Sequence, residues 1–326
     1  MPRRPALPGL LSVVIALSLA GCAGAPGGPA EPRAATATAA GFPYTVDNCG
    51  VRTTFTAPPR RAVTMNQHAT EILLALGLKD RLVGTAYLDD AIGPKYRADY
   101  EKIPVLAPEY PDKETLLAAE PDFVYGGYGS AFDKAAGRSR ADLSAAHVNT
   151  RLNTEYCGKG PVGVPQLRTE ITEVARTFGV PERGERLIAE ETRRIDAAVA
   201  RVAGSPRPTV FAFDSGEGSA FTSGGKGIGN EVITLAGGTN VFADLDDTFG
   251  DVSWEQVIDR APQVILIYDY GKTDVEAKKK RLLEDPALAS VPAVRDKRFV
   301  VLPLSSVVLG VRVADAVESL AGQLHP

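Results

Sequence analysis

Histidine and serine chemistry usually leaves short, fixed motifs in a sequence, and this chain lacks the common ones. Its three histidines, His68, His147 and His325, lie far apart among 326 residues. The chain has no His-Glu-x-x-His and no Gly-x-Ser-x-Gly motif, so neither a zinc peptidase nor an α/β hydrolase is indicated. A glycosidase-type pair of carboxylates stays open, because counting acidic residues does not exclude it. We therefore expect no enzyme and keep a hydrolase as the less favoured alternative.

The cysteines predict two kinds of covalent link. Cys22 follows Leu19-Ala20-Gly21 at the end of an apolar run that begins at Leu10, with Arg3 and Arg4 before it. This run is about half the ~20 residues of a membrane-spanning helix and fits the apolar part of a secretory signal. The pattern resembles a bacterial lipoprotein signal, in which the cysteine thiol carries the lipid. An ordinary signal peptide with a chance cysteine is the alternative.

Export would place the other two cysteines, Cys49 and Cys157, in an oxidising compartment, so we expect them to form a disulfide. Two free buried thiols are the alternative. Residues 23–41 consist mainly of Ala, Gly, Pro and Thr and cannot bury enough apolar surface to become ordered. We predict a signal peptide at 1–21 and a flexible tether at 22–41, which would hold the folded part at the extracytoplasmic face of the cell membrane.

Strand and helix patterns alternate along most of the remaining chain, which predicts an α/β fold with largely parallel sheets. Ala69–Leu76 has helical spacing, and Gly77 after it is a typical helix end. The predicted strands are Tyr44–Val46, Val51–Phe55, Ala62–Met65, Arg81–Thr85, Phe123–Tyr125, Val148–Leu152, Thr209–Phe213, Val264–Tyr268 and Arg298–Leu302. The other predicted helices outside the middle are Asp112–Ala119, Phe132–Ala146, Ile228–Ala236, Trp254–Arg260 and Val311–Leu320.

The middle of the chain predicts two consecutive helices, Pro165–Phe178 and Pro181–Val202, each with proline where a helix begins. The second is rich in helix formers and in charge pairs four residues apart, and it would span roughly 30 Å. We interpret it as a rigid connection between two lobes; an ordinary packing helix of one domain is the alternative. The predicted domains are an N-terminal α/β lobe at 42–164, linker helices at 165–203 and a C-terminal α/β lobe at 204–326.

The second half of the chain repeats motifs of the first in the same order. The segment Glu71–Gly77 corresponds to Glu231–Gly237. Glu114 and Glu255 each stand seven residues before a proline, and in both places a strand and then tyrosines follow. Two related lobes would face each other, and open α/β sheets bind ligands beyond the carboxyl ends of their strands. The prediction is therefore two Rossmann-like lobes joined by a long rigid helix, with a ligand cleft between the lobes.

These motifs resemble those of the helix-linked ABC substrate-binding proteins for iron-siderophores, haem and cobalamin. The most specific marks are Pro59–Val63, Thr70–Leu78, the paired Glu…Pro units and Ala236–Asp244. The resemblance implies that Glu114 and Glu255, one from each lobe, dock onto arginines of a membrane permease. The alternative is that each is a solvated glutamate favoured by the first turn of its helix.

Candidate ligand residues are those expected near the cleft, where they would offer amide, imidazole, aromatic, hydroxyl and cationic groups. Arg312 or Lys226 would suit an anionic ferric complex. Structural roles are the alternatives: a satisfied polar residue for His68, core packing for Trp254 and a salt bridge for either cation. The glycine-rich segment 224–229 lacks the spacing of phosphate-binding loops, so we interpret it as a flexible cleft loop. The full set is Asn66, His68, Tyr87, Tyr128, Phe132, Thr222, Lys226, Trp254, Tyr268, Tyr270 and Arg312.

The resemblance and the N-terminal signal together imply the solute-binding lipoprotein of an ABC importer, which captures a ferric siderophore and delivers it to the permease. Cobalamin or haem is the alternative ligand, and a zinc or manganese carrier would normally need several histidines in its cleft. A net charge of −4 without a basic stripe argues against nucleic acid. We expect a monomer with no cofactor and no directly bound metal, whose partners are the ligand, the permease and, through the lipid, the membrane. An anchored protein-interaction module is a competing class.

Overall fold

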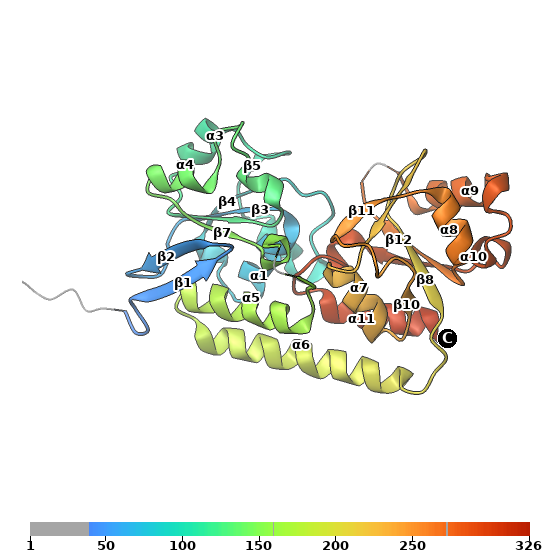
Figure 1. Ribbon diagram of the computed structural model, residues 1–326. Helices are drawn as coiled ribbons and strands as arrows, with labels where there is room; N and C mark the ends of the chain where they lie inside the picture. Colours follow the sequence, from blue (N-terminus) through green and yellow to red (C-terminus); the bar gives the residue numbers. More distant parts are fainter. Residues whose placement is uncertain (1–38, 159, 272) are drawn as a thin grey trace, which may run out of the picture. The chain divides into compact units, whose positions relative to one another are not determined.

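Short apolar runs build two parallel sheets in the computed structural model, which describes residues 39–326 except 159 and 272. The predicted signal peptide, Cys22 and almost all of the predicted tether lie outside the described residues. Figure 1 shows the two sheets in separate lobes, with one long helix below them. Nowhere in this described part does a helix combine the length and apolarity needed to cross a membrane.

The sheet of the first lobe has five parallel strands. In spatial order they are β5 (Val105–Ala107), β4 (Leu82–Ala86), β3 (Ala62–Met65), β6 (Phe123–Gly126) and β7 (Asn149–Leu152). All residues of β3 and β6 are buried, as expected for central strands covered on both faces. An antiparallel hairpin precedes the sheet, formed by β1 (Tyr44–Asn48) and β2 (Val51–Phe55). The helices of this lobe are α1 (Gln67–Ala75), α2 (Arg97–Tyr100), α3 (Lys113–Ala118) and α4 (Arg140–Ala145).

The sheet of the second lobe has four parallel strands. In spatial order they are β10 (Thr239–Asn240), β8 (Thr209–Phe213), β12 (Val264–Asp269) and β13 (Phe299–Pro303). A separate antiparallel pair consists of β9 (Ala220–Ser223) and β11 (Phe249–Val252). The helices are α7 (Ile228–Leu235), α8 (Trp254–Arg260), α9 (Val275–Glu284), α10 (Pro292–Arg295) and α11 (Val313–Leu324).

The two sheets share one strand order, which agrees with the repeat seen in the sequence. Without the edge strand β5, the spatial order is β4-β3-β6-β7 in the first sheet and β10-β8-β12-β13 in the second. In both sheets the strand that comes second along the chain lies at the edge, beside the strand that comes first. The equivalent helices α1 and α7 both stop at a glycine, Gly77 and Gly237, with φ angles of 67° and 80°. Only glycine adopts such angles readily, which explains why both helices end there.

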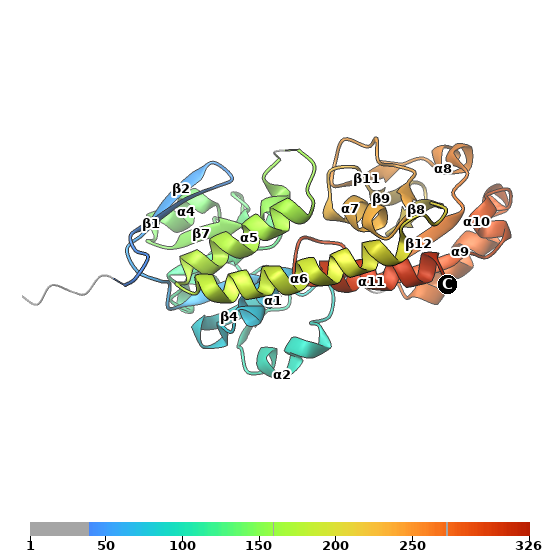
Figure 2. The same cartoon turned by 90° about the horizontal axis from the view of Figure 1, so that it is seen from below.

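Two consecutive helices connect the lobes: α5 (Val164–Thr177) and α6 (Pro181–Val202). Figures 1 and 2 show α6 lying along α5 at one end and along α11 at the other. A single buried apolar cluster contains residues from both sheets and from these helices, for example Tyr125 on β6, Ile195 on α6 and Leu266 on β12. The fold is thus the predicted one, two α/β lobes joined by a long helix. The residue boundaries given for the domains stay predictions.

One predicted helix is wrong over its first part. Residues 129–132 form a short 3₁₀ turn, and only Arg140–Ala145 is helical within the predicted segment Phe132–Ala146. Gly137 adopts a φ of 64°, and Ser139 then starts α4 by accepting a hydrogen bond from the Asp142 N–H at 3.1 Å. Because a positive φ is incompatible with a continuous helix, the chain before Gly137 cannot belong to α4, and α4 begins after its capping residue Ser139.

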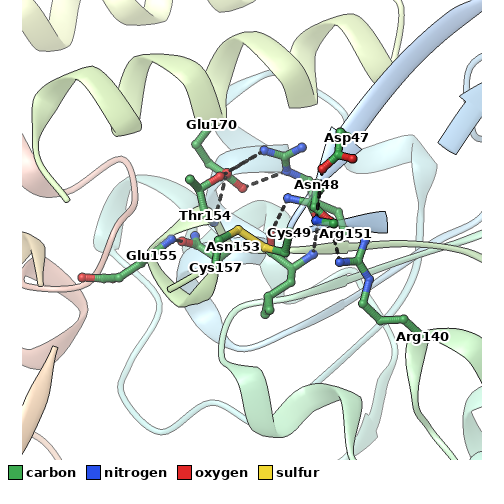
Figure 3. The surroundings of a disulfide bond; sticks show 12 residues. Asp47, Asn48, Cys49, Arg140, Arg151, Asn153, Thr154, Glu155, Cys157 and Glu170 are labelled. Atoms are coloured by element: carbon green, nitrogen blue, oxygen red, sulfur yellow. Dashed lines mark hydrogen bonds and ion pairs between the residues drawn. A yellow bond between two sulfur atoms is a disulfide. The ribbon is translucent and has the colours of Figure 1, made fainter. Parts of the chain in front are cut away.

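Cys49 and Cys157 are joined by a disulfide across 108 residues, with their Cα atoms 4.8 Å apart (Figure 3). The bond ties the hairpin to the end of the first lobe. Beside it, Asn48 bonds Leu152 twice: its side-chain amide donates to the carbonyl at 2.9 Å, and its side-chain oxygen accepts from the N–H at 2.8 Å. The hairpin is therefore fixed to β7 by hydrogen bonds and to the segment after β7 by a covalent bond.

A buried ion pair lies next to the disulfide (Figure 3). The Arg151 guanidinium donates twice to the Glu170 carboxylate, at 2.9 and 2.6 Å, and both side chains are almost completely buried. Glu170 also accepts hydrogen bonds from the Thr154 N–H and the Tyr125 hydroxyl. Burial acts to raise the pKa of Glu170, but the charge and hydrogen bonds of Arg151 outweigh it and leave the pKa below its usual value. This network fixes α5 to the first sheet.

Candidate functional site

The carboxyl ends of strands from both sheets meet at a cleft of about 560 Å³. Parallel strands bring their following loops to one edge of a sheet, and such edges bind ligands in open α/β folds. The wall from the first lobe follows β4, β6 and β7 and consists of Tyr87, Asp89, Tyr128, Gly129, Ser130 and Tyr156. The wall from the second lobe consists of Asp214, Phe221, Asp247, Thr248, Phe249, Tyr270 and Leu304. Asp214, Tyr270 and Leu304 directly follow β8, β12 and β13.

Asn66 lies behind the first wall and forms hydrogen bonds with residues of that wall. It follows β3 with a φ of 78°, an uncommon angle for a residue other than glycine. Its side-chain oxygen accepts from the Tyr110 hydroxyl at 3.0 Å and from the Tyr128 N–H at 3.3 Å, and its amide donates to the Tyr87 carbonyl at 3.3 Å. Asn66 is fully buried. It therefore positions two tyrosines of the cleft without lining the cleft itself.

The aromatic rings of the first wall support one another. Tyr128 meets the Tyr156 ring edge-on, with centroids 5.3 Å apart, and it meets His68 in the same way at 4.9 Å. His68 is almost completely buried, and burial lowers its pKa, so the imidazole is neutral at pH 7. Neither ring nitrogen has a hydrogen-bond partner within the described residues. His68 thus supports Tyr128 and presents no surface to the cleft.

The second wall combines stacked rings with a polar pair. Phe221 on β9 and Phe249 on β11 stack with centroids 5.9 Å apart. The Tyr270 hydroxyl donates a hydrogen bond of 2.5 Å to the Asp214 carboxylate. Burial raises the pKa of Asp214, although the bond from Tyr270 acts in the opposite direction. The wall therefore offers flat apolar surface beside a carboxylate.

The charged groups of the cleft are acidic. Asp89, Asp214 and Asp247 line it, and no Lys, Arg or His is found among the described lining residues. One oxygen of Asp89, Oδ1, is buried and accepts no hydrogen bond from the described part of the chain. Burial, followed by the negative charge of Asp89, raises the pKa of Tyr128 well above its usual value. The tyrosine is therefore neutral and available as a hydrogen-bond donor.

The two cations predicted to pair with an anionic ligand lie elsewhere. Arg312 donates to Glu71 at 2.8 Å and to the Ala91 carbonyl at 2.6 Å. Lys226 pairs with Asp246 at 2.9 Å. Each cation has a carboxylate partner and neither lines the cleft, as the structural alternative expects; a role for either in ligand binding stays a prediction.

Four further candidates also serve the structure around the cleft. Tyr268 is fully buried and shares a hydrogen bond of 2.7 Å with Ser223. Thr222 donates to the Ala212 carbonyl at 2.6 Å. The Trp254 indole donates to the Glu217 carbonyl at 2.8 Å and packs on Phe211 and Phe213. The Phe132 ring packs over Gly126 and lies beside the Arg140 guanidinium. Of the sequence candidates, only Tyr87, Tyr128 and Tyr270 line the cleft.

Sequence reasoning missed most of the acidic and several aromatic residues of the cleft. Asp214 could have been predicted as a cleft residue. It comes directly after a strand that was predicted correctly, and ligands bind beyond the carboxyl ends of such strands. Phe221 and Phe249 carried no such signal, since β9 and β11 are short and pair across a long stretch of chain. No group of three or more potential metal-binding side chains occurs among the described residues.

Glu114 and Glu255 occupy equivalent positions in the two lobes. Each is the second residue of its helix, α3 or α8, after a capping residue: Asp112 accepts from the Thr115 N–H at 2.7 Å, and Ser253 accepts from the Gln256 N–H at 3.3 Å. Both glutamates are exposed. Figure 1 shows α3 and α8 on the side of the molecule away from α6. The repeat therefore places one exposed glutamate in the first turn of an equivalent helix in each lobe.

Comparison with known proteins identifies the family. Residues 63–305 match the model of the periplasmic binding protein family. The vitamin B12-binding protein of Yersinia pestis is 27% identical over 212 residues, which cover 64% of this chain and 69% of that protein. A periplasmic binding protein from Veillonella parvula is similar in structure, with a TM-score of 0.80, 30% identity and coverage of 86% of this chain and 97% of that one.

The periplasmic haem-binding protein RhuT from Roseiflexus, in its apo form, has a TM-score of 0.67 and 27% identity, with coverage of 82% and 98%. Proteins of this group are solute-binding proteins and not enzymes. The match covers both sheets and the connecting helices, so the chain belongs to the periplasmic binding protein family.

Proposed function

We propose that this protein captures a ligand of the iron-siderophore type outside the cytoplasm and delivers it to the permease of an ABC importer. The observation that carries the proposal is the cleft of about 560 Å³, lined by aromatic rings and placed at the strand ends of two lobes. Ligand sites are commonly concave, mostly apolar and equipped with a few polar groups. We also propose that a lipid on Cys22 holds the protein at the membrane.

Haem or cobalamin is the second candidate ligand. Four tyrosines line the cleft: Tyr87, Tyr128, Tyr156 and Tyr270. A tyrosine oxygen is one of the axial ligands that haem iron accepts in proteins. The relatives whose names refer to haem and vitamin B12 make both ligands reasonable members of a test panel.

Delivery would use the two exposed glutamates. Complementary charges at a protein interface improve the encounter rate and the register more than the affinity. Glu114 and Glu255 stand at equivalent positions in different lobes, so together they would orient the loaded protein on arginines of the permease.

Thermal unfolding and calorimetric titration of the purified protein test the capture function. The panel contains ferric siderophores of different classes, haemin and cobalamin. A ligand that binds only the folded state stabilises it by about 2.7 kcal/mol at a free concentration of 100 Kd. We expect one ligand class to raise the Tm in a saturable way. A folded protein whose Tm does not respond to any member of the panel would contradict the proposal.

A further inference from the structure

The charges of the cleft indicate which ligands it can accept. We propose that the cleft selects ligands with a cationic or neutral surface and excludes polyanionic ferric complexes. This inference rests on the proposed function and narrows it to a class of ligand.

The first observation is the sign of the charge. Both walls contribute carboxylates, Asp89 from the first lobe and Asp214 and Asp247 from the second, and no described lining residue is basic. An anionic ligand placed between these walls would meet like charges at close range. Inside a protein such repulsion is screened less than in water, so it weighs heavily in the choice of ligand.

The second observation is that nearby basic groups are already engaged. The ammonium group of Lys278 donates to the Tyr268 carbonyl at 2.6 Å and lies 4.8 Å from the centre of the Tyr270 ring. It is buried outside the set of lining residues. Arg312 and Lys226 are held by Glu71 and Asp246. Arg312 and Lys278 are buried, so neither could turn toward an anionic ligand without leaving a buried partner unpaired. Lys226 forms its ion pair at the surface with the exposed Asp246, outside the lining of the cleft.

The third observation is the unpartnered oxygen of Asp89. Its Oδ1 atom is buried and accepts no hydrogen bond from the described residues, although its side chain lines the cleft. A buried acceptor without a donor is costly, and the cost disappears when a ligand supplies an N–H or O–H group. A rotation of the half-buried Asp89 side chain would bring this oxygen to the cleft surface, where an ammonium, amide or hydroxyl group of a ligand would supply the donor.

The aromatic rings favour the same ligands. The faces of Phe221 and Phe249, and of the tyrosines around them, carry partial negative charge and attract cations. The flat stack between β9 and β11 also suits an apolar linker. Rings and carboxylates therefore act together on a ligand that combines apolar length with a positive or neutral end.

Ferric complexes differ in this respect. Three hydroxamates neutralise Fe³⁺, so a linear ferric trihydroxamate with a free terminal amine is singly positive. Three catecholates leave the complex with several negative charges. The proposal predicts binding of the first kind and rejection of the second.

A charge series on one scaffold tests the proposal with the unaltered protein. Calorimetric titration compares three forms of the linear ferric trihydroxamate: the free amine, the N-acetylated form and the N-succinylated form, which are positive, neutral and negative. We expect the affinity to fall in that order, by about tenfold or more between the first and the last, and the difference to shrink as salt screens the charges. A ferric tricatecholate should bind more weakly than all three.

Two variants assign the effect to the cleft. Asp89→Asn and Asp247→Asn should each reduce the affinity ratio between the amine and succinyl forms. Asp196→Asn removes an exposed carboxylate from α6 and should leave the ratio unchanged. Equal or tighter binding of the succinyl form or of the tricatecholate would overturn the inference while leaving the capture function intact. Failure of every ferric complex, haemin and cobalamin to bind would overturn both.

Discussion

At the scale of single residues, Glu155 links the two lobes at a point where a charge is costly. It belongs to the first lobe, and its carboxylate accepts hydrogen bonds from the Ile228 N–H at 2.8 Å and the Leu309 N–H at 2.7 Å, both in the second lobe. Burial raises the pKa of Glu155 to about 7, although the two N–H bonds act to lower it. The same cause, burial, raises the pKa of Glu191 on α6 to about 7. Burial thus raises the pKa of two carboxyl groups to about 7, one at the contact between the lobes and one on α6.

The stability of the protein should fall as the pH rises through this range. The folded-state pKa of Glu155 and Glu191 lies above the unfolded value of about 4.3, so the folded protein binds more protons between pH ~4.3 and ~7. By linkage, deprotonation in this window favours unfolding. Thermal unfolding from pH 5 to 8 should show a decreasing Tm, and Glu155→Gln and Glu191→Gln should each flatten the profile. Profiles parallel to that of the unaltered protein would rule out these two residues as the cause.

At the scale of elements, the hairpin β1–β2 is held on the lobe by the disulfide and Asn48 in addition to the core packing of Tyr44, Val46 and Phe55. The bond closes a loop of 108 residues, which contains the whole first sheet. A crosslink stabilises chiefly by restricting the unfolded chain, and a loop of this length corresponds to about 4–5 kcal/mol in the chain-entropy model.

Replacement of both cysteines, Cys49→Ser with Cys157→Ser, should lower the free energy of unfolding by roughly that amount, about 4–5 kcal/mol. Denaturant unfolding of the double variant measures it. The unaltered protein in reducing buffer provides a matched control and should lose a similar amount. A loss below about 1 kcal/mol in both would mean that the crosslink contributes little to stability.

Elements with strong local signals could be predicted closely from the sequence. The bounds of α6 agree with the prediction because Pro181 sets its start and the helix formers that follow leave little alternative. β8 and α8 agree for similar reasons: one is a short apolar run, and the other has a cap at Ser253. The segment after Phe132 failed because the positive φ of Gly137 is a property of the folded turn that helical spacing does not reveal.

The cleft was predictable only in part. We predicted Tyr87, Tyr128 and Tyr270 near the cleft because each follows a predicted strand, and all three line the cleft. Tyr268 does not line the cleft, because alternate residues of a strand point to opposite faces and the face of Tyr268 packs into the core. The pairing of Arg312 with Glu71 joins residues far apart in the chain, and no local pattern gives such a contact.

At the scale of the whole molecule, the proposed docking surface depends on how firmly the lobes are connected. Glu114 and Glu255 belong to different lobes, and one apolar cluster runs through both lobes with α5, α6 and α11. A connection packed in this way resists bending, because bending would break core contacts on both sides. The separation of the two carboxylates would then stay nearly constant between the empty and the loaded protein.

Charge reversal at both glutamates, Glu114→Lys with Glu255→Lys, should abolish ligand uptake by cells while leaving the ligand affinity of the purified protein unchanged. Both side chains are exposed, so the variant should fold normally. Reversal of two other exposed glutamates, Glu101→Lys with Glu284→Lys, keeps the same net charge and should leave uptake intact. Normal uptake by the first variant would disprove the docking role.

The position of the disulfide has a consequence for how an extracytoplasmic chain is made. A secreted polypeptide leaves the translocation channel N-terminus first, so Cys49 and Cys157 both emerge before α6 and before any strand of the second lobe. The bond needs no residue beyond 157. Oxidation can therefore link the hairpin to the end of the first lobe while α6 and the second lobe are still in transit, before either is needed to hold that link.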